Sequence, residues 1–113
     1  MSVVIQGYLT KEGAKVKSWR KRWCVLRDDT ICYSKNQTSG ELGVIKLEAK
    51  SEVVPIQKKS RKNVFEVKTP GSRSYYLQAE NDEEYASWTK AIKEAIATKN
   101  GGGGGGAAGG GGG

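Results

Sequence analysis

Basic side chains gather in one short stretch of the sequence, and their types suit the binding of phosphate. The stretch 11–35 holds eight bases and three acids. Arginine presents a planar fork to phosphate, lysine a mobile point charge, and small loop residues let backbone N–H groups approach an anion. Cations this close repel one another, so a polyanion would turn the repulsion into attraction. The polar candidates are Lys11, Lys15, Lys17, Arg20, Arg22 and Tyr33.

A predicted hairpin positions the second half of this cluster. Residues 19–27 alternate as a strand, Asp28 and Asp29 form a two-residue turn, and residues 30–35 return. In this register Cys24 lies opposite Tyr33, and Arg22 lies opposite Lys35. Arg22, Tyr33 and Lys35 then share one face, with Arg20 further along it. Lys11 ends the preceding strand, next to the loop that contains Lys15 and Lys17.

The rest of the chain predicts a mainly β fold with one C-terminal helix. Strands are expected at 4–11, 19–27, 30–35, 43–47, 53–56, 63–68 and 74–79, with 58–62 as a loop. Pro55 marks the fifth strand as an edge. A helical stripe runs from Tyr85 through Trp88 to Ile96, and Asn81 is its expected N-cap, so the helix begins near Asp82. We expect a seven-stranded bent antiparallel sandwich or barrel, capped by the helix.

One domain accounts for residues 1–100, and residues 101–113 are a glycine- and alanine-rich tail that we expect to be a flexible linker. The aromatic residues Trp19, Trp23, Phe65 and Trp88 are assigned mainly to the core. Cys24 and Cys32 point to opposite faces of their hairpin and should not form a disulfide, which suits a reducing compartment. The sequence shows no signal peptide and no apolar run long enough to span a membrane, so we expect an intracellular, soluble domain.

Composition argues against catalysis. The chain has no histidine, which excludes every histidine-based triad and metal site, and two cysteines cannot build a zinc site alone. No nucleophile–base pair is visible, and the acids 82–84 suit a helix start. We therefore expect no enzyme activity, no catalytic residue, no metal and no cofactor. The net charge is +7, with 19 Lys and Arg against 12 Asp and Glu, and it favours an anionic partner.

The sequence resembles a pleckstrin homology (PH) domain over residues 5–98. The resemblance lies in Gly-Tyr-Leu-Thr-Lys-Glu-Gly at 7–13, in Lys-Ser-Trp-Arg-Lys-Arg-Trp-Cys-Val-Leu at 17–26, and in Trp88 of the predicted helix. The stretch 11–22 is also similar to the basic signature of PH domains that bind 3-phosphorylated phosphoinositides, including those of tandem PH-domain proteins.

The resemblance implies a role for each site residue. Lys11 and Arg22 would clamp the 3- and 4-phosphates, and Tyr33 would contact the 4-phosphate. Arg20 would lie toward the 1-phosphate and the bilayer, and Lys15 and Lys17 would flank the headgroup.

Two positions bear on specificity. Leu42 stands where strong trisphosphate binders often carry a further base. Ala14 follows Gly13 where many such binders have a second glycine, and its methyl group could crowd the 5-phosphate. The resemblance therefore leans toward phosphatidylinositol 3,4-bisphosphate, with the 3,4,5-trisphosphate close behind.

The leading hypothesis is a signalling module that binds phosphoinositide lipids and is recruited from the cytoplasm to the plasma membrane or another phosphoinositide-bearing membrane, as a monomer. Val16 and the bases of 58–62 could add nonspecific attraction to the bilayer, or be ordinary surface residues. The alternative is a protein–protein interaction domain with only nonspecific affinity for acidic lipids. A nucleic-acid binder would need exposed aromatic residues in a basic groove, so we expect no nucleic acid.

Overall fold

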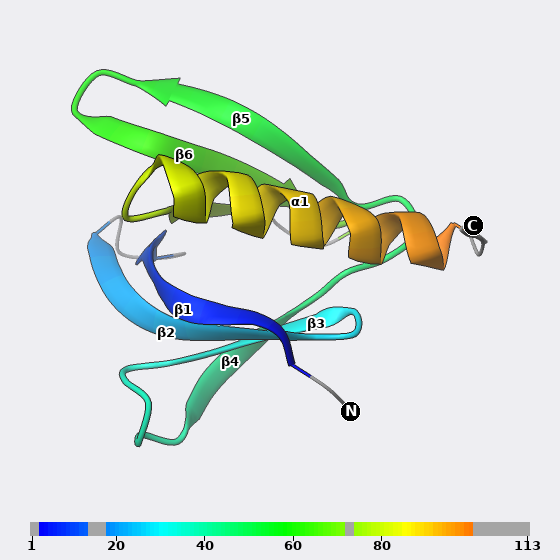
Figure 1. Ribbon diagram of the computed structural model, residues 1–113, viewed down its shortest axis with the longest axis horizontal. Coiled ribbons are helices and arrows are strands. Elements are labelled where there is room, and N and C mark those ends of the chain that lie inside the picture. The colour runs from blue at the N-terminus through cyan, green and yellow to red at the C-terminus, as the bar shows by residue number, and fades with distance from the viewer. Residues whose placement is uncertain (1–2, 14–17, 72–73, 101–113) are drawn as a thin grey trace.

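The chain folds into one curled antiparallel sheet and one helix in a computed structural model that describes residues 3–13, 18–71 and 74–100 (Figure 1). The strands are β1 (Val3–Glu12), β2 (Trp19–Arg27), β3 (Thr30–Ser34), β4 (Glu41–Lys46), β5 (Glu52–Lys58), β6 (Arg61–Lys68) and β7 (Ser74–Gln78); the helix is α1 (Asp82–Lys99). The predicted fold class and the number of elements are therefore confirmed.

The strand order is β4-β3-β2-β1-β7-β6-β5, so the first strand lies at the centre of the sheet. Because β1 pairs with both β2 and β7, the two halves of the sheet join there, and the sheet curls into a half-barrel. β4 and β5 are its two edges. Pro55 lies in β5, an edge strand, as the sequence predicted.

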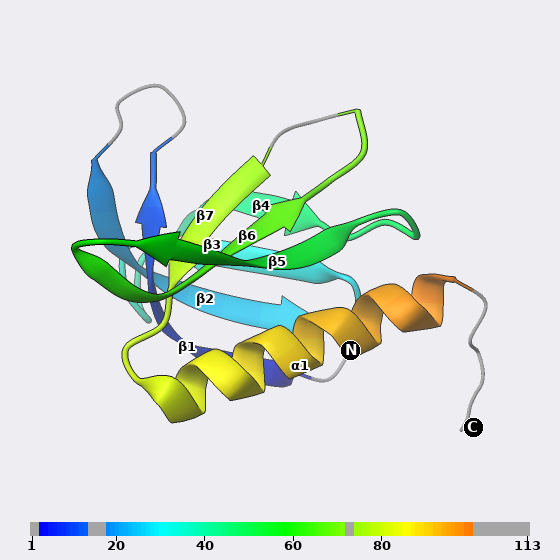
Figure 2. The ribbon, with the colours of Figure 1, turned by 90° about the horizontal axis from the view of Figure 1, so that it is seen from above.

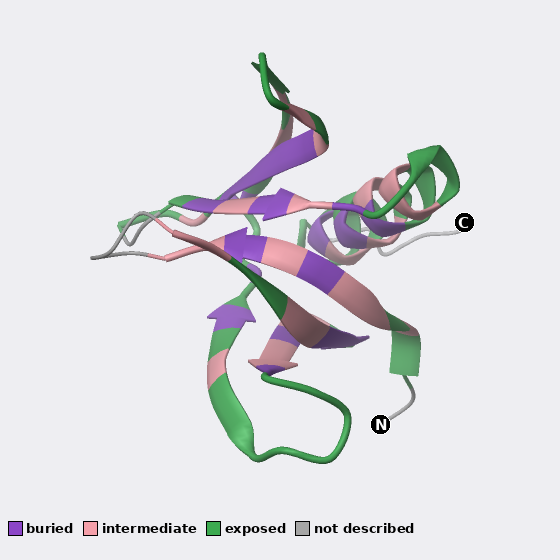
Figure 3. Cartoon of the chain, turned by 90° about the vertical axis from the view of Figure 1, so that its left-hand side faces the viewer, coloured by how far each residue is buried: buried purple, intermediate pink, exposed green. Residues whose placement is uncertain are grey.

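Helix α1 lies between the β5–β6 hairpin and the β1–β2 layer (Figures 1 and 2), in contact with β1, β5 and β6. Asn81 caps it, because the backbone N–H of Glu84 donates to Asn81 Oδ1 at 2.8 Å. The buried face of the helix (Figure 3) carries Trp88, Ile92 and Ile96, which are spaced four residues apart. An amphipathic helix gains its stability by such burial rather than from propensity alone.

Two of the four aromatic residues assigned to the core lie outside it. Phe65 and Trp88 are fully buried, but Trp19 and Trp23 are only half-buried. Strand alternation gives the physical reason: Trp23 pairs across the ladder with Tyr8, and their rings meet edge to face at 5.0 Å on the outer side of the sheet. Trp19 stacks against the Arg61 guanidinium, 4.5 Å from its ring centroid.

The predicted β2–β3 register is confirmed as far as its strands extend, with Cys24 opposite Tyr33. The ladder ends at the pair Trp23–Ser34, so Arg22 does not pair with an exposed Lys35. β3 ends at Ser34 because the chain turns there into the β3–β4 loop. The Ser34 hydroxyl donates to the Asn36 carbonyl within this turn.

The basic segment 58–62 also differs from the expected loop. Lys58 ends β5 and Arg61 begins β6, so only residues 59–60 form the turn. No proline interrupts the ladder here, and Lys58 pairs with Arg61.

Cys24 and Cys32 are free thiols, as predicted. Burial raises the pKa of the Cys24 thiol to about 12. Within the described ranges, α1 is too polar to cross a membrane, and no three His, Cys, Asp or Glu side chains group as they would around a metal ion.

Candidate ligand-binding site

A cavity of about 350 Å³ lies at the end of the sheet where β1 ends and β2 begins. Three cationic side chains and one tyrosine face it. No carboxylate is among its described lining residues, which are Lys11, Gly13, Ser18, Arg20, Arg22, Tyr33 and Leu42. Four of the seven predicted site residues thus meet at one cavity.

The β1–β2 ladder explains why the cations meet. Lys11 lies directly opposite Arg20, and Leu9 lies opposite Arg22. Residues directly opposite each other in an antiparallel pair project from the same face, and residues two apart on one strand do so as well. Arg20 and Arg22 therefore stand on the side of the sheet that carries Lys11.

Lys11 is the most buried cation of the site, with only 8% of its surface exposed. Its Nζ lies 4.7 Å from the ring centroid of Tyr33 and 5.7 Å from that of Tyr75. Aromatic faces attract a cation through their quadrupole, which offsets part of the cost of removing the ammonium from water. The two tyrosines come from β3 and β7, on either side of the β1–β2 pair.

The two arginines are more accessible. Arg20 is exposed, and Arg22 is half-buried, with one guanidinium nitrogen donating to the Lys21 carbonyl at 3.0 Å. Neither forms an ion pair with a carboxylate in the described part of the chain. Their charge is therefore available to an anion that enters the cavity.

Three predicted residues, Ala14, Lys15 and Lys17, lie outside the described residues, as does Val16. Ser18 lines the cavity although the sequence interpretation gave it no role. Its position, one residue before the strand that carries Arg20 and Arg22, could have placed it in the site. Leu42 also borders the cavity with an apolar side chain, and 54% of its surface is exposed.

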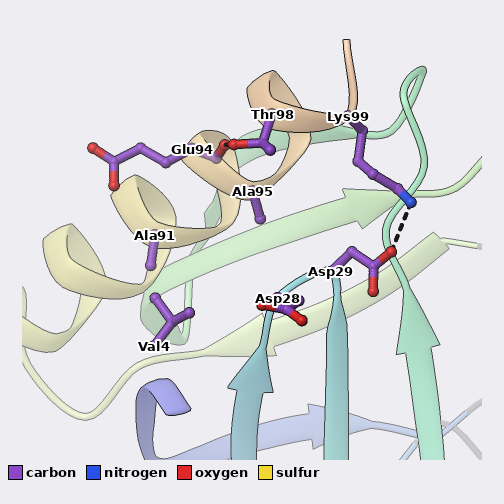
Figure 4. A pocket seen from close by; sticks show the side chains of 8 residues that line it. All are labelled: Val4, Asp28, Asp29, Ala91, Glu94, Ala95, Thr98 and Lys99. Atoms are coloured by element: carbon purple, nitrogen blue, oxygen red, sulfur yellow. Dashed lines mark hydrogen bonds and ion pairs between the residues drawn. The ribbon is translucent and has the colours of Figure 1, made fainter. Parts of the chain in front are cut away.

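The opposite end of β2 has a different character. There a second cavity, of about 400 Å³, lies between the β2–β3 turn, the start of β1 and the second half of α1 (Figure 4). Asp29 at its edge accepts from Lys99 Nζ at 2.7 Å and lies 3.0 Å from Lys46 Nζ. These partners, Lys99 first, hold the pKa of the Asp29 carboxyl far below its usual range. Lys46 and Lys99 at this end are therefore paired with a carboxylate.

A third basic feature lies on the β5–β6 hairpin, where Lys58, Lys59 and Lys62 are exposed. Lys58 Nζ stands 5.9 Å from the Tyr76 ring centroid. Arg61 donates to Gln78 Oε1 at 2.7 Å while it stacks on Trp19. None of these four bases lines the cavity beside Lys11.

Comparisons with known proteins agree on one family. The PH domain family model matches residues 3–97. A RAC family serine/threonine-protein kinase homolog of Dictyostelium discoideum is 45% identical over 90 residues, which cover 77% of this chain and 20% of the kinase. Human pleckstrin homology domain-containing family A member 2 is 37% identical over 100 residues, 83% of this chain and 23% of that protein. The chain thus spans about a fifth of the length of these relatives.

Among solved structures, the C-terminal PH domain of pleckstrin in complex with D-myo-Ins(1,2,3,5,6)P5 superimposes with a TM-score of 0.76. The two chains are 32% identical, and the alignment covers 84% of this chain and 96% of that one. The fold and the position of the helix therefore agree with those of a domain whose crystals hold an inositol phosphate.

Proposed function

Because this chain belongs to the PH domain family, we propose that it is a non-enzymatic, phosphoinositide-binding module that recognises a 3-phosphorylated inositol headgroup. The observation that carries the proposal is the cavity lined by Lys11, Arg20, Arg22 and Tyr33, with no carboxylate among its described lining residues. The pleckstrin domain found with an inositol pentakisphosphate supports the ligand class.

Each side chain has a proposed task. Lys11 and Arg22 hold the 3- and 4-phosphates, because they extend into the cavity from neighbouring positions of β1 and β2. The Tyr33 hydroxyl donates to the 4-phosphate. Arg20, the exposed member, faces the 1-phosphate and the bilayer, and Lys15 and Lys17 flank the headgroup from the loop between β1 and β2.

We further propose recruitment of a cytoplasmic monomer to the plasma membrane or another membrane that carries such lipids. The exposed lysines of the β5–β6 hairpin favour this role, since each basic side chain near an anionic surface contributes about 1 kcal/mol. Nucleic acid is not the proposed partner, because single-strand binding uses exposed aromatic platforms in the groove, and the tyrosine here lies against Lys11.

Calorimetric titration with soluble headgroups tests the proposal. The headgroups of phosphatidylinositol 3,4-bisphosphate and 3,4,5-trisphosphate should bind more tightly than that of the 4,5-bisphosphate. Arg22→Ala should weaken binding about 10-fold or more, because it removes a charge-assisted pair of hydrogen bonds. The control is Lys93→Ala on the exposed side of α1, which removes the same charge far from the cavity. Equal losses in both variants, or no preference for the 3-phosphate, would refute the site.

The choice between bisphosphate and trisphosphate depends on Ala14 in this proposal. The bisphosphate headgroup should bind at least as tightly as the trisphosphate headgroup. Ala14→Gly should improve binding of the trisphosphate alone, because it removes the methyl group proposed to crowd the 5-phosphate. An equal change for both headgroups would contradict this role.

A second candidate function is a protein-interaction domain, and the cavity at the far end of β2 favours it. Val4, Ala91 and Ala95 give that cavity an apolar wall, and Val4 has 54% of its surface exposed (Figure 4). A protein partner that binds Arg22→Ala and the parent chain equally, in a domain without lipid selectivity, would support this function over the first.

A further inference from the structure

Gly43 in β4 lies directly opposite Tyr33 in β3. A β-carbon placed on Gly43 would come within 2.7 Å of the Tyr33 ring carbon Cζ and nearer still to its hydroxyl oxygen. Real β-carbons do not approach other atoms so closely. The tyrosine ring therefore lies across the space that any other residue at position 43 would fill.

The backbone does not require a glycine at this position. Among the described glycines only Gly71 has a positive φ, the conformation that other residues adopt with strain. Glycine inside a strand otherwise weakens the strand and often marks a close approach of another group. The requirement at position 43 is therefore steric, and the group that approaches is Tyr33.

Tyr33 in turn touches the most buried cation of the cavity. Lys11 Nζ stands 4.7 Å from its ring centroid, and both side chains line the cavity. The three residues thus form a series, in which Gly43 makes room for Tyr33 and Tyr33 supports Lys11. Gly43 itself does not line the cavity.

We propose that Gly43 is a positioning residue of the headgroup site, whose missing side chain lets the Tyr33 ring lie beneath Lys11 at the edge of the cavity; the proposal rests on the proposed function. A methyl group at position 43 pushes the Tyr33 ring off the sheet. The lysine then loses one of its aromatic neighbours, and the ring enters space that a phosphate would occupy.

The first test is a double-mutant cycle in headgroup titrations. Gly43→Ala should weaken binding of the 3,4-bisphosphate headgroup about 3- to 10-fold, and Tyr33→Ala should do the same. The variant Y33A/G43A should be no weaker than Y33A, because the added methyl then meets empty space. Losses that multiply in the double variant would overturn the proposal.

The chain offers a matched control in Gly40. It lies in the loop before β4, and a β-carbon there would have no neighbour within 4 Å. Gly40→Ala should bind the headgroup like the parent chain. If Gly43→Ala lowers the thermal midpoint of unfolding, Y33A/G43A should unfold at the same temperature as Y33A, and a further drop would also overturn the proposal.

A second readout needs no ligand. The Tyr33 ring current should shift the ε-methylene proton resonances of Lys11 upfield in NMR spectra. This shift should shrink in Gly43→Ala, fall to the same level in Tyr33→Ala, and persist in Gly40→Ala. An unchanged Lys11 resonance in folded Gly43→Ala overturns the positioning role, whereas a parent chain without headgroup binding refutes the proposed function alone.

Discussion

Lys11 and Arg20 lie directly opposite each other across the β1–β2 ladder, two positive charges on the same face of the sheet. Like charges directly opposite in an antiparallel pair destabilise it. Arg20 gains no compensating carboxylate in the described part of the chain. The unliganded domain therefore carries a repulsion that a bound polyanion would relieve.

Replacing Arg20 should separate stability from affinity. Arg20→Gln should raise the free energy of unfolding by roughly 0.2–1 kcal/mol, because it removes the like-charge pair, while it weakens headgroup binding. Urea denaturation and calorimetry measure the two quantities. The control Lys93→Gln removes an equal charge from the exposed side of α1 and should change neither. A destabilised Arg20→Gln would contradict this interpretation of the pair.

Asp29 should make the stability depend on acid pH. Its pKa is lowered in the folded state by Lys99 and then Lys46, so the unfolded chain takes up the proton first. The contribution is thus present above the unfolded pKa, about 3.9, and is lost as the pH falls toward the folded value. Asp29→Asn should lower the free energy of unfolding by about 1 kcal/mol at neutral pH, and the difference from the parent chain should shrink as the pH falls below 4.

Denaturant titrations of Asp29→Asn between pH 7 and 2.5 give the measurement. Asp28→Asn is the matched control, because it removes the same charge from the same turn without breaking an ion pair of the described residues. Asn also tolerates the positive φ of 50° at position 28. Parallel pH profiles for Asp29→Asn and the parent chain would disprove the role of the Asp29 ion pairs.

Cys24 should resist alkylation in the folded protein. Burial raises its pKa to about 12, so little thiolate exists at pH 8, and the thiol is also inaccessible. In a Cys32→Ser background, iodoacetamide should modify no thiol in native buffer and one thiol in denaturant, as mass spectrometry would show. Rapid native labelling would mean that the core opens around β2.

Trp88 should contribute more to stability than Trp23, although the side chains are identical. Trp88 is fully buried on the inner face of α1, so Trp88→Ala should lower the free energy of unfolding by about 3–5 kcal/mol. Trp23 is half-buried on the outer face of the sheet, so Trp23→Ala should lower the free energy of unfolding clearly less than Trp88→Ala does. Chemical denaturation compares the two variants, and equal costs would show that α1 does not seal the core through Trp88.

The sequence predicted the fold because its local signals agree with one another. A two-residue turn at Asp28 and Asp29 fixes the β2–β3 register, and an extended Asn81 before an apolar helical stripe fixes the start of α1. The meeting of Lys11 with Arg20 and Arg22 followed from the same alternation of side chains along the strands. Pro55 likewise marked the edge.

Other features depend on tertiary packing, which decides which face of a strand is buried and which strands become neighbours. Trp19 and Trp23 are large and apolar, which favoured the core, but the opposite side of β2 carries the buried residues Cys24 and Leu26. Tyr75 lies near Lys11 because β7 pairs with β1. Gly43 gave one usable signal, a glycine inside a strand, but its neighbour Tyr33 is identified only by the β3–β4 register.

The central place of β1 has a consequence for biosynthesis. Lys11 is translated well before Tyr75, which belongs to the last strand, and α1 follows that strand in the sequence. A nascent chain that has been synthesised only as far as β6 therefore lacks the Tyr75 ring that lies beside Lys11 in the complete domain. Non-local pairing of this kind also slows folding. On the proposed function, nascent fragments that end before β7 should therefore bind the headgroup more weakly than the complete domain.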